Sequence, residues 1–98
     1  MPMRHLFIVS YDISDRLRWA KVYKTMRGFG EHLQLSVFQC DLTPAQKIRM
    51  RAALSEIINH EQDQVVIVDL GPTEGREVKE IEAIGRPMEP IRREPLVV

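Results

Sequence analysis

The segment His5-Leu6-Phe7-Ile8-Val9-Ser10-Tyr11-Asp12 is rich in β-branched and aromatic residues and contains four consecutive apolar positions. Such a composition is typical of a strand in the middle of a sheet. Asp12 ends the apolar run, so we expect a carboxylate at the surface, where the buried strand turns into the next element. A group held there is rigid, as a binding or catalytic side chain must be.

A helix is predicted directly after this strand. Ser14 or Asp15 can cap its first turn, because a side-chain oxygen there accepts hydrogen bonds from unpaired amides, and Gly28 and Gly30 end it. At about 100° per residue, the apolar side chains fall on one stripe and the basic side chains on the opposite arc. The stripe is Trp19, Val22, Tyr23 and Met26, and the basic residues are Arg16, Arg18, Lys21, Lys24 and Arg27. The basic face is either a phosphate-binding surface or simply a solvated helix face.

Residues 31–42 alternate with period two over more length than one strand typically needs, which predicts two strands with a join near Gln34 to Ser36. A second helix begins at Thr43-Pro44-Ala45-Gln46. Thr43 is a good N-cap, proline suits the first helical position, and the glutamine completes a capping box. We expect this helix to end near Asn59.

Residues 64–70 predict another buried strand, closed by the turn pair Gly71-Pro72. The resulting order βαββαβ predicts the α+β class and a ferredoxin-like sandwich, with two helices over one face of an antiparallel sheet. We expect this domain to span residues 1–85, with an additional C-terminal strand over residues 76–84. Residues 86–98 are a C-terminal extension whose apolar end predicts contact with a second copy of the chain or with another partner.

The composition, 44% hydrophobic and 29% charged over 98 residues, is that of a small globular domain. The sequence has no apolar stretch near the about 20 residues of a membrane span, and its single cysteine, Cys40, predicts no disulfide framework and no zinc site. A cytoplasmic protein without membrane association is expected. Residues 1–30 hold six Lys/Arg and two acidic residues, whereas residues 61–98 hold five and nine. Nucleic acid would therefore contact the first helix.

Three segments carry a family resemblance: Tyr11-Asp12-Ile13-Ser14-Asp15, the basic helix that ends at Gly30, and Gln34-Leu35-Ser36-Val37-Phe38. Together they resemble the CRISPR-associated protein 2 family, over residues 5 to 84. The resemblance implies a ferredoxin-like homodimer that is a Mg²⁺-dependent endonuclease on RNA or DNA. It further implies a role in spacer acquisition and antiviral defence, beside the integrase CRISPR-associated protein 1. The chain departs from many members at His32, where they are basic.

The resemblance implies Tyr11 and Asp12 as catalytic residues and Asp12 as the metal ligand. Charge and resemblance together assign nucleic-acid binding to Arg16, Arg18, Lys21, Ser36 and Phe38. A magnesium ion is commonly held by one or two carboxylates plus substrate phosphates, so we expect one ion shared by Asp12 of both protomers. Two alternatives stay open. Asp12 could only cap the helix, and Phe38 could fill the core, although the alternation of its neighbours favours exposure and stacking on a base.

Three further polar residues are expected to be structural. His5 and His60 lie at element ends where a hydrogen-bonded histidine is the simpler interpretation than a metal ligand, and Asp69 is expected to cap the end of its strand. The competing functions are then an endonuclease and a non-catalytic, dimeric DNA-binding scaffold that bridges integrase subunits. A ferredoxin-like sensor of small molecules would draw on the fold alone.

Overall fold

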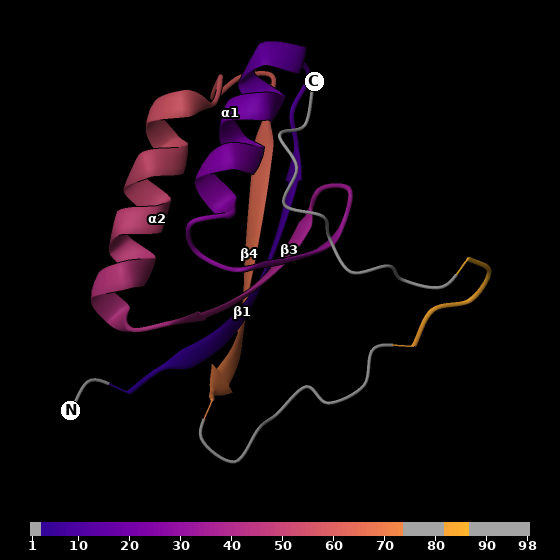
Figure 1. The fold of residues 1–98 in the computed structure, drawn as a ribbon. Coiled ribbons are helices and arrows are strands. Elements are labelled where there is room, and N and C mark those ends of the chain that lie inside the picture. The colour runs from indigo at the N-terminus through magenta and orange to yellow at the C-terminus, as the bar shows by residue number, and fades with distance from the viewer. Residues whose placement is uncertain (1–2, 74–81, 87–98) are drawn as a thin grey trace.

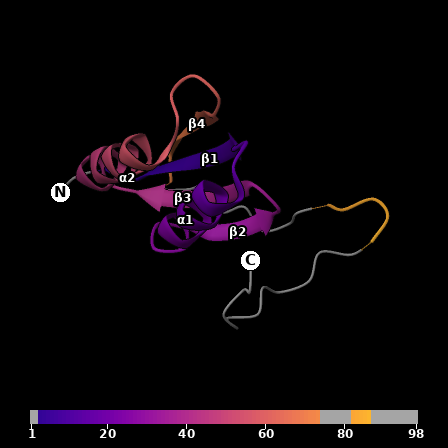
Figure 2. The same ribbon diagram turned by 90° about the horizontal axis from the view of Figure 1, so that it is seen from above.

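The computed structural model describes residues 3–73 and 82–86. Its elements follow the predicted order: β1 (His5–Asp12), α1 (Arg16–Met26), β2 (Glu31–Gln34), β3 (Val37–Leu42), α2 (Pro44–Ile57) and β4 (Gln64–Pro72). The four strands form one sheet in the order β2-β3-β1-β4, visible in Figure 2, and each neighbouring pair is antiparallel. The α+β class and the ferredoxin-like topology are therefore confirmed.

The core lies between the two helices and one face of this sheet. Alternate residues of β1 point toward the helices, and Phe7, Val9 and Tyr11 are buried there. Figure 1 shows α1 and α2 side by side, and both contribute to the same cluster. The other members of the cluster are Val22, Tyr23, Met26, Phe38, Cys40, Leu42, Met50 and Leu54. The period-two alternation of a strand thus decides which residues of β1 join this cluster; Leu6, which alternates to the other face, is also buried but is not part of the cluster.

The opposite face of the sheet is not covered by a helix of the described residues. It carries the even-numbered side chains of β1 and β4. Val66 and Val68 are 44% and 45% exposed on it, and Ile8 of β1 is half-buried. Apolar side chains on an uncovered sheet face are typical of an interaction surface. We call this surface the open face.

Local signals placed most element ends correctly. Thr43 caps α2 in a complete capping box with Gln46, and Pro44 stands at the start of that helix. The join between β2 and β3 lies at residues 35–36, within the predicted interval. The turn predicted at Gly71-Pro72 is wrong, because β4 continues to Pro72. A register shift and the positive φ of Gly71, 94°, let the strand bulge and continue pairing.

Two predictions fall largely outside the described residues. The additional strand expected over residues 76–84 is described only at residues 82–84, which form neither helix nor strand. Beyond Arg86, the C-terminal extension lies outside the described residues as well. Across residues 3–73 and 82–86, no helix is long and apolar enough to cross a membrane.

Candidate functional site

Asp12 is the last residue of β1, and its side chain is exposed. On one side Asp12 is paired with Gln64 of β4. On the other side the N–H of the preceding residue, Tyr11, donates to the Ser36 carbonyl of the β2–β3 turn at 3.0 Å. Within the described part of the chain, the Asp12 carboxylate makes no hydrogen bond and no ion pair. A rigid backbone therefore holds at the end of the sheet a carboxylate that has no intramolecular partner among the described residues; we call it uncommitted.

The helix that follows is capped by Asp15. Its carboxylate accepts from the Arg18 N–H at 2.9 Å, and its extended backbone (φ −117°, ψ 132°) is that of an N-cap. The alternative that Asp12 only caps the helix is therefore wrong. Because another residue satisfies the helix start, Asp12 remains available to a ligand.

Tyr11 does not accompany Asp12 into the site. Successive side chains of a strand leave on opposite faces, and Tyr11 is buried in the core at 4% exposure. Its ring lies 6.2 Å from that of Phe38, and its hydroxyl has no hydrogen-bond partner among the described residues. Burial, and secondarily the neighbouring Tyr23, raises the pKa of Tyr11. One protomer thus does not bring the two predicted catalytic groups together.

The predicted exposure of Phe38 is also wrong. Phe38 is fully buried and pairs with Val9 on the helix side of the sheet. Its ring stands 4.8 Å from that of His32, whose Nε2–H donates to the Leu35 carbonyl and so braces the β2–β3 turn. The β2–β3 turn interrupts the period-two alternation and leaves Leu35 77% exposed. Extending the alternation through this turn therefore assigned Phe38 to the wrong face of the sheet.

Ser36 serves the architecture of this turn. Its hydroxyl accepts from the Trp19 indole N–H at 3.1 Å, which ties the β2–β3 turn to α1. Its carbonyl accepts from Tyr11, as described above. The structure therefore gives Ser36 a role in positioning the turn beside Asp12, and its predicted contact with nucleic acid remains a prediction.

The basic residues of α1 divide into two groups. Arg16 and Lys21 are exposed and make no ion pair with any described residue. Arg18 is different, because its side chain is only 25% exposed and its guanidinium Nε lies 2.8 Å from Asp63. The guanidinium of Arg18 is thus engaged by a carboxylate inside the molecule, and its predicted contact with phosphate stays a prediction.

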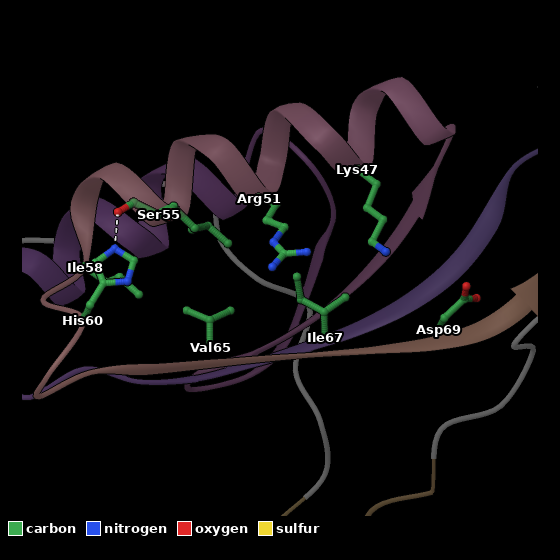
Figure 3. A pocket seen from close by; sticks show the side chains of 9 residues that line it. Lys47, Arg51, Ser55, Ile58, His60, Val65, Ile67 and Asp69 are labelled. Atoms are coloured by element: carbon green, nitrogen blue, oxygen red, sulfur yellow. Dashed lines mark hydrogen bonds between the residues drawn. The ribbon is translucent and has the colours of Figure 1, made fainter.

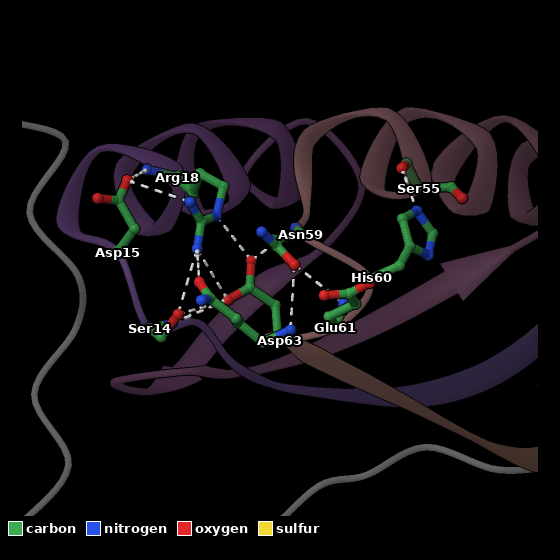
Figure 4. A network of polar contacts seen from close by, with 9 residues as sticks. Ser14, Asp15, Arg18, Ser55, Asn59, His60, Glu61 and Asp63 are labelled. Carbon is green, nitrogen blue, oxygen red and sulfur yellow. Dashed lines mark hydrogen bonds and ion pairs between the residues drawn. The ribbon is translucent and has the colours of Figure 1, made fainter.

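Asp63 precedes β4 and has no solvent-accessible side-chain surface. Figure 4 shows its carboxylate facing Ser14 and Arg18 from the α2–β4 turn. The hydrogen bond from Arg18, followed by the N–H groups of Ser14 and Asn59, holds the pKa of Asp63 well below its usual value. Sequence inspection missed this residue. Its signal is weak, because an Asn59-to-Asp63 spacing before a strand suggests only a turn.

Acid should weaken the fold through Asp63. A carboxyl group whose pKa is depressed on folding adds stability above its unfolded-state pKa, near ~3.9, and loses that contribution as the pH falls through its folded-state pKa. Asp63→Asn should therefore destabilise the protein most near neutral pH, and the difference from the wild type should shrink below about pH 4. Urea unfolding followed over the acid range measures this, and a constant difference would contradict it.

His5 and His60 make the hydrogen bonds expected of structural histidines. The prediction that Asp69 caps the end of its strand is wrong, because Asp69 lies inside β4, which continues to Pro72. His5 Nδ1 lies 2.9 Å from a carboxylate oxygen of Asp69, and that oxygen also accepts from the Gly71 N–H at 2.8 Å. His60 Nε2 donates to the Ser55 carbonyl near the end of α2. An open groove of about 390 Å³ lies between α2 and β4. Figure 3 shows Lys47 and Arg51 on the α2 side of this groove and Val65 and Ile67 on the β4 side. His5 and Asp69 lie at the opposite end of the β1–β4 pair from Asp12, whereas Val65 pairs with Tyr11, the residue before Asp12.

A comparison with protein-family models matches residues 3–78 to the family described as CRISPR associated protein Cas2. The chain belongs to this family. A CRISPR-associated endoribonuclease Cas2 of Geobacter sulfurreducens is 51% identical over 98% of this chain and 100% of its own length. A second, from Rhodospirillum rubrum, is 40% identical over 96% of this chain and 91% of its own.

Solved Cas2 structures share the fold. The crystal structure of Streptococcus pyogenes Cas2 superimposes with a TM-score of 0.68 and 29% sequence identity, over 82% of this chain and 99% of that one. Another crystal structure, titled only as Cas2, has a TM-score of 0.74 and 26% identity, over 91% and 95% of the two chains. The βαββαβ core of the chain is therefore that of Cas2 proteins.

The donor set for a metal in this Cas2 family member is small. Among the residues described, no three His, Cys, Asp or Glu side chains cluster as metal ligands. The single carboxylate of Asp12 still fits Mg²⁺, because that ion needs only one or two carboxylates and takes its remaining oxygens from water and phosphate. At this strand end, one protomer supplies one such carboxylate.

Proposed function

We propose that this protein is a Mg²⁺-dependent endonuclease that cleaves RNA or DNA as a homodimer, in CRISPR spacer acquisition and antiviral defence. The observation that carries the proposal is the uncommitted, exposed carboxylate of Asp12 at the end of a central strand. The exposed cations Arg16 and Lys21 follow Asp12 in the sequence by four and nine residues, on α1. The names of the relatives, CRISPR-associated endoribonucleases, support the same chemistry.

The homodimer would form through the open face. Asp12 belongs to the even-numbered side chains of β1 that leave on that face, together with Ile8. A two-fold contact between open faces would bury Val66 and Val68 and would bring the two Asp12 side chains toward one axis. Activity would then depend on dimer concentration as well as on the metal.

The residues of the chain have distinct roles in this mechanism. Asp12 of each protomer would hold Mg²⁺, which supplies charge stabilisation at the phosphodiester and activates water. Arg16 and Lys21 would bind phosphates beside the scissile bond and orient the substrate strand. The β1 backbone, paired on both sides, keeps the carboxylate in place during turnover.

A cleavage assay tests the proposal. Labelled single-stranded RNA and duplex DNA are incubated with the protein in Mg²⁺ and in EDTA, at protein concentrations below and above the dimer transition. We expect cleavage of at least one substrate in Mg²⁺, loss of cleavage in EDTA, and a steep rise in specific activity as dimers form. Cleavage that survives EDTA would contradict the metal mechanism.

A second candidate function is a dimeric scaffold that holds duplex DNA and bridges subunits of the integrase, CRISPR-associated protein 1. The small donor set favours it, since one carboxylate per protomer is less than most nuclease sites offer and exposed cations alone suffice for DNA binding. Scaffolding predicts that DNA binding and integrase binding persist in EDTA. The two functions differ in their dependence on the Asp12 carboxylate.

Replacing both Arg16 and Lys21 by alanine should weaken nucleic-acid binding and reduce its salt dependence. Each phosphate contact contributes about 0.7 to 0.9 to the magnitude of the slope of log affinity against log salt, so two lost contacts lower that magnitude by about 1.5 for each protomer that contacts the nucleic acid. A fluorescence titration at several salt concentrations measures it. The matched control replaces the exposed Arg49 and Arg51 of α2, and an equal loss in that control would contradict a role specific to α1.

A further inference from the structure

The Asp63 carboxylate is a hub that accepts five hydrogen bonds. Its Oδ1 accepts from the Ser14 N–H at 2.9 Å, from the Ser14 hydroxyl at 3.0 Å and from Arg18 Nη2 at 3.3 Å. Its Oδ2 accepts from Arg18 Nε and from the Asn59 N–H, both at 2.8 Å. Such charge-assisted bonds are the strong ones in proteins. Because no side-chain surface of Asp63 reaches solvent, the carboxylate is fully used inside the molecule.

The hub closes a short ring of chain around Asp12. Asp12 pairs with Gln64, the residue directly after Asp63. Two residues beyond Asp12, the Ser14 N–H and hydroxyl bond to Asp63 itself. The loop between β1 and α1 is thus held at both ends by the start of β4, through the sheet pairing on one side and the carboxylate on the other.

The Asp12 side chain has no described partner of its own, so its direction depends on this backbone. We propose that Asp63 is the positioning residue of the Asp12 site. It fixes the loop at Ser14 and thereby aims the Asp12 carboxylate, while Arg18 compensates its charge. The inference rests on the proposed function for its effect on metal binding. The holding of the loop follows from the contacts alone.

A comparable carboxylate at the other end of the sheet supplies a matched control. Asp69 pairs with His5 and accepts from the Gly71 N–H, and its side chain is 48% exposed. It lies at the opposite end of β4 from Gln64. Asp69→Asn therefore removes a hydrogen-bonded carboxylate from the same strand without touching the β1–α1 loop.

The experiment compares Asp63→Asn, Asp69→Asn and the wild-type full chain. In Asp63→Asn, the new amide NH₂ faces hydrogen-bond donors and cannot accept from them, so the loop loses hydrogen bonds. We therefore expect hydrogen exchange of the Ser14 amide to be at least about tenfold faster. Mg²⁺ binding, measured by calorimetry, should weaken about tenfold, as is typical when the residue orienting a ligand is lost. The Mg²⁺ concentration for half-maximal cleavage should rise by the same factor, while cleavage at saturating Mg²⁺ stays near the wild-type rate. Asp69→Asn should leave all three unchanged.

Two outcomes would overturn the inference. One is a folded Asp63→Asn protein with wild-type exchange at Ser14; the other is loss of Mg²⁺ affinity equal to that in Asp69→Asn. If Asp63→Asn does not fold, Ser14→Ala decides instead, because it removes the hydroxyl contacts with Asp63 and Arg18 but keeps the backbone N–H bond to Asp63. This variant should loosen the loop and weaken Mg²⁺ binding about threefold. Unchanged loop exchange in Ser14→Ala would then reject the proposal. A wild-type protein that binds no Mg²⁺ would contradict the proposed function. Hydrogen exchange of the Ser14 amide would still test whether Asp63 positions the loop.

Discussion

Asp12→Asn is expected to abolish Mg²⁺-dependent cleavage while leaving fold and nucleic-acid binding intact. An amide of the same shape carries no charge to hold the cation. The ion supplies several kcal/mol of transition-state stabilisation, so the cleavage rate should fall at least about 100-fold. The Asp12 side chain is exposed and makes no described contact, so the free energy of unfolding should change by less than about 0.5 kcal/mol. Single-turnover cleavage and urea unfolding measure the two effects.

The control for this variant is Glu56→Gln, which neutralises an exposed carboxylate on a helix, α2. It should cleave at the wild-type rate. The effect of Asp12→Asn also separates the two candidate functions, because a DNA-binding scaffold does not need the Asp12 carboxylate. Unaltered cleavage by Asp12→Asn would reject the metal mechanism, and loss of DNA binding would show that Asp12 acts through structure.

The parts of the fold that could be predicted were those with a local chemical signal. The capping box from Thr43 to Gln46 and the apolar run of β1 each depend on residues close in sequence, and both were correct. Asp12 could be predicted for the same reason, since a carboxylate at a strand exit is visible without knowing the fold. Local chemistry therefore located the candidate ligand before its surroundings were known.

The surroundings of the site depend on contacts between distant residues. Arg18 looked like one more cation on a basic helix, but its partner Asp63 lies 45 residues away. No local pattern announces such a pair. The sequence around Leu35 and Ser36 contains no Gly, Pro or Asn, so the residue at which the turn reset the alternation was not visible. The predicted exposure of Phe38 was wrong for this reason, and the engagement of Arg18 by Asp63 was not anticipated.

Phe38→Ala is expected to destabilise the protein by about 3–5 kcal/mol, the range for a fully buried phenylalanine, because it removes the ring and leaves a cavity among the core side chains. For a domain of marginal stability, this is a large part of the total. Phe38→Leu, which refills part of the cavity, should recover most of the loss. Chemical denaturation of all variants measures the free energies.

Base stacking would give the opposite pattern for Phe38. An aromatic that stacks on a base contributes about 1–3 kcal/mol to binding, so its removal would weaken nucleic-acid affinity in a protein that remains stable. Burial predicts instead that the folded fraction of Phe38→Ala binds with wild-type affinity at low temperature. The exposed Leu35, in the adjacent turn, is the matched control, and its alanine variant should change stability by less than about 0.5 kcal/mol. A stable Phe38→Ala protein with impaired binding would show that the ring leaves the core to meet its substrate.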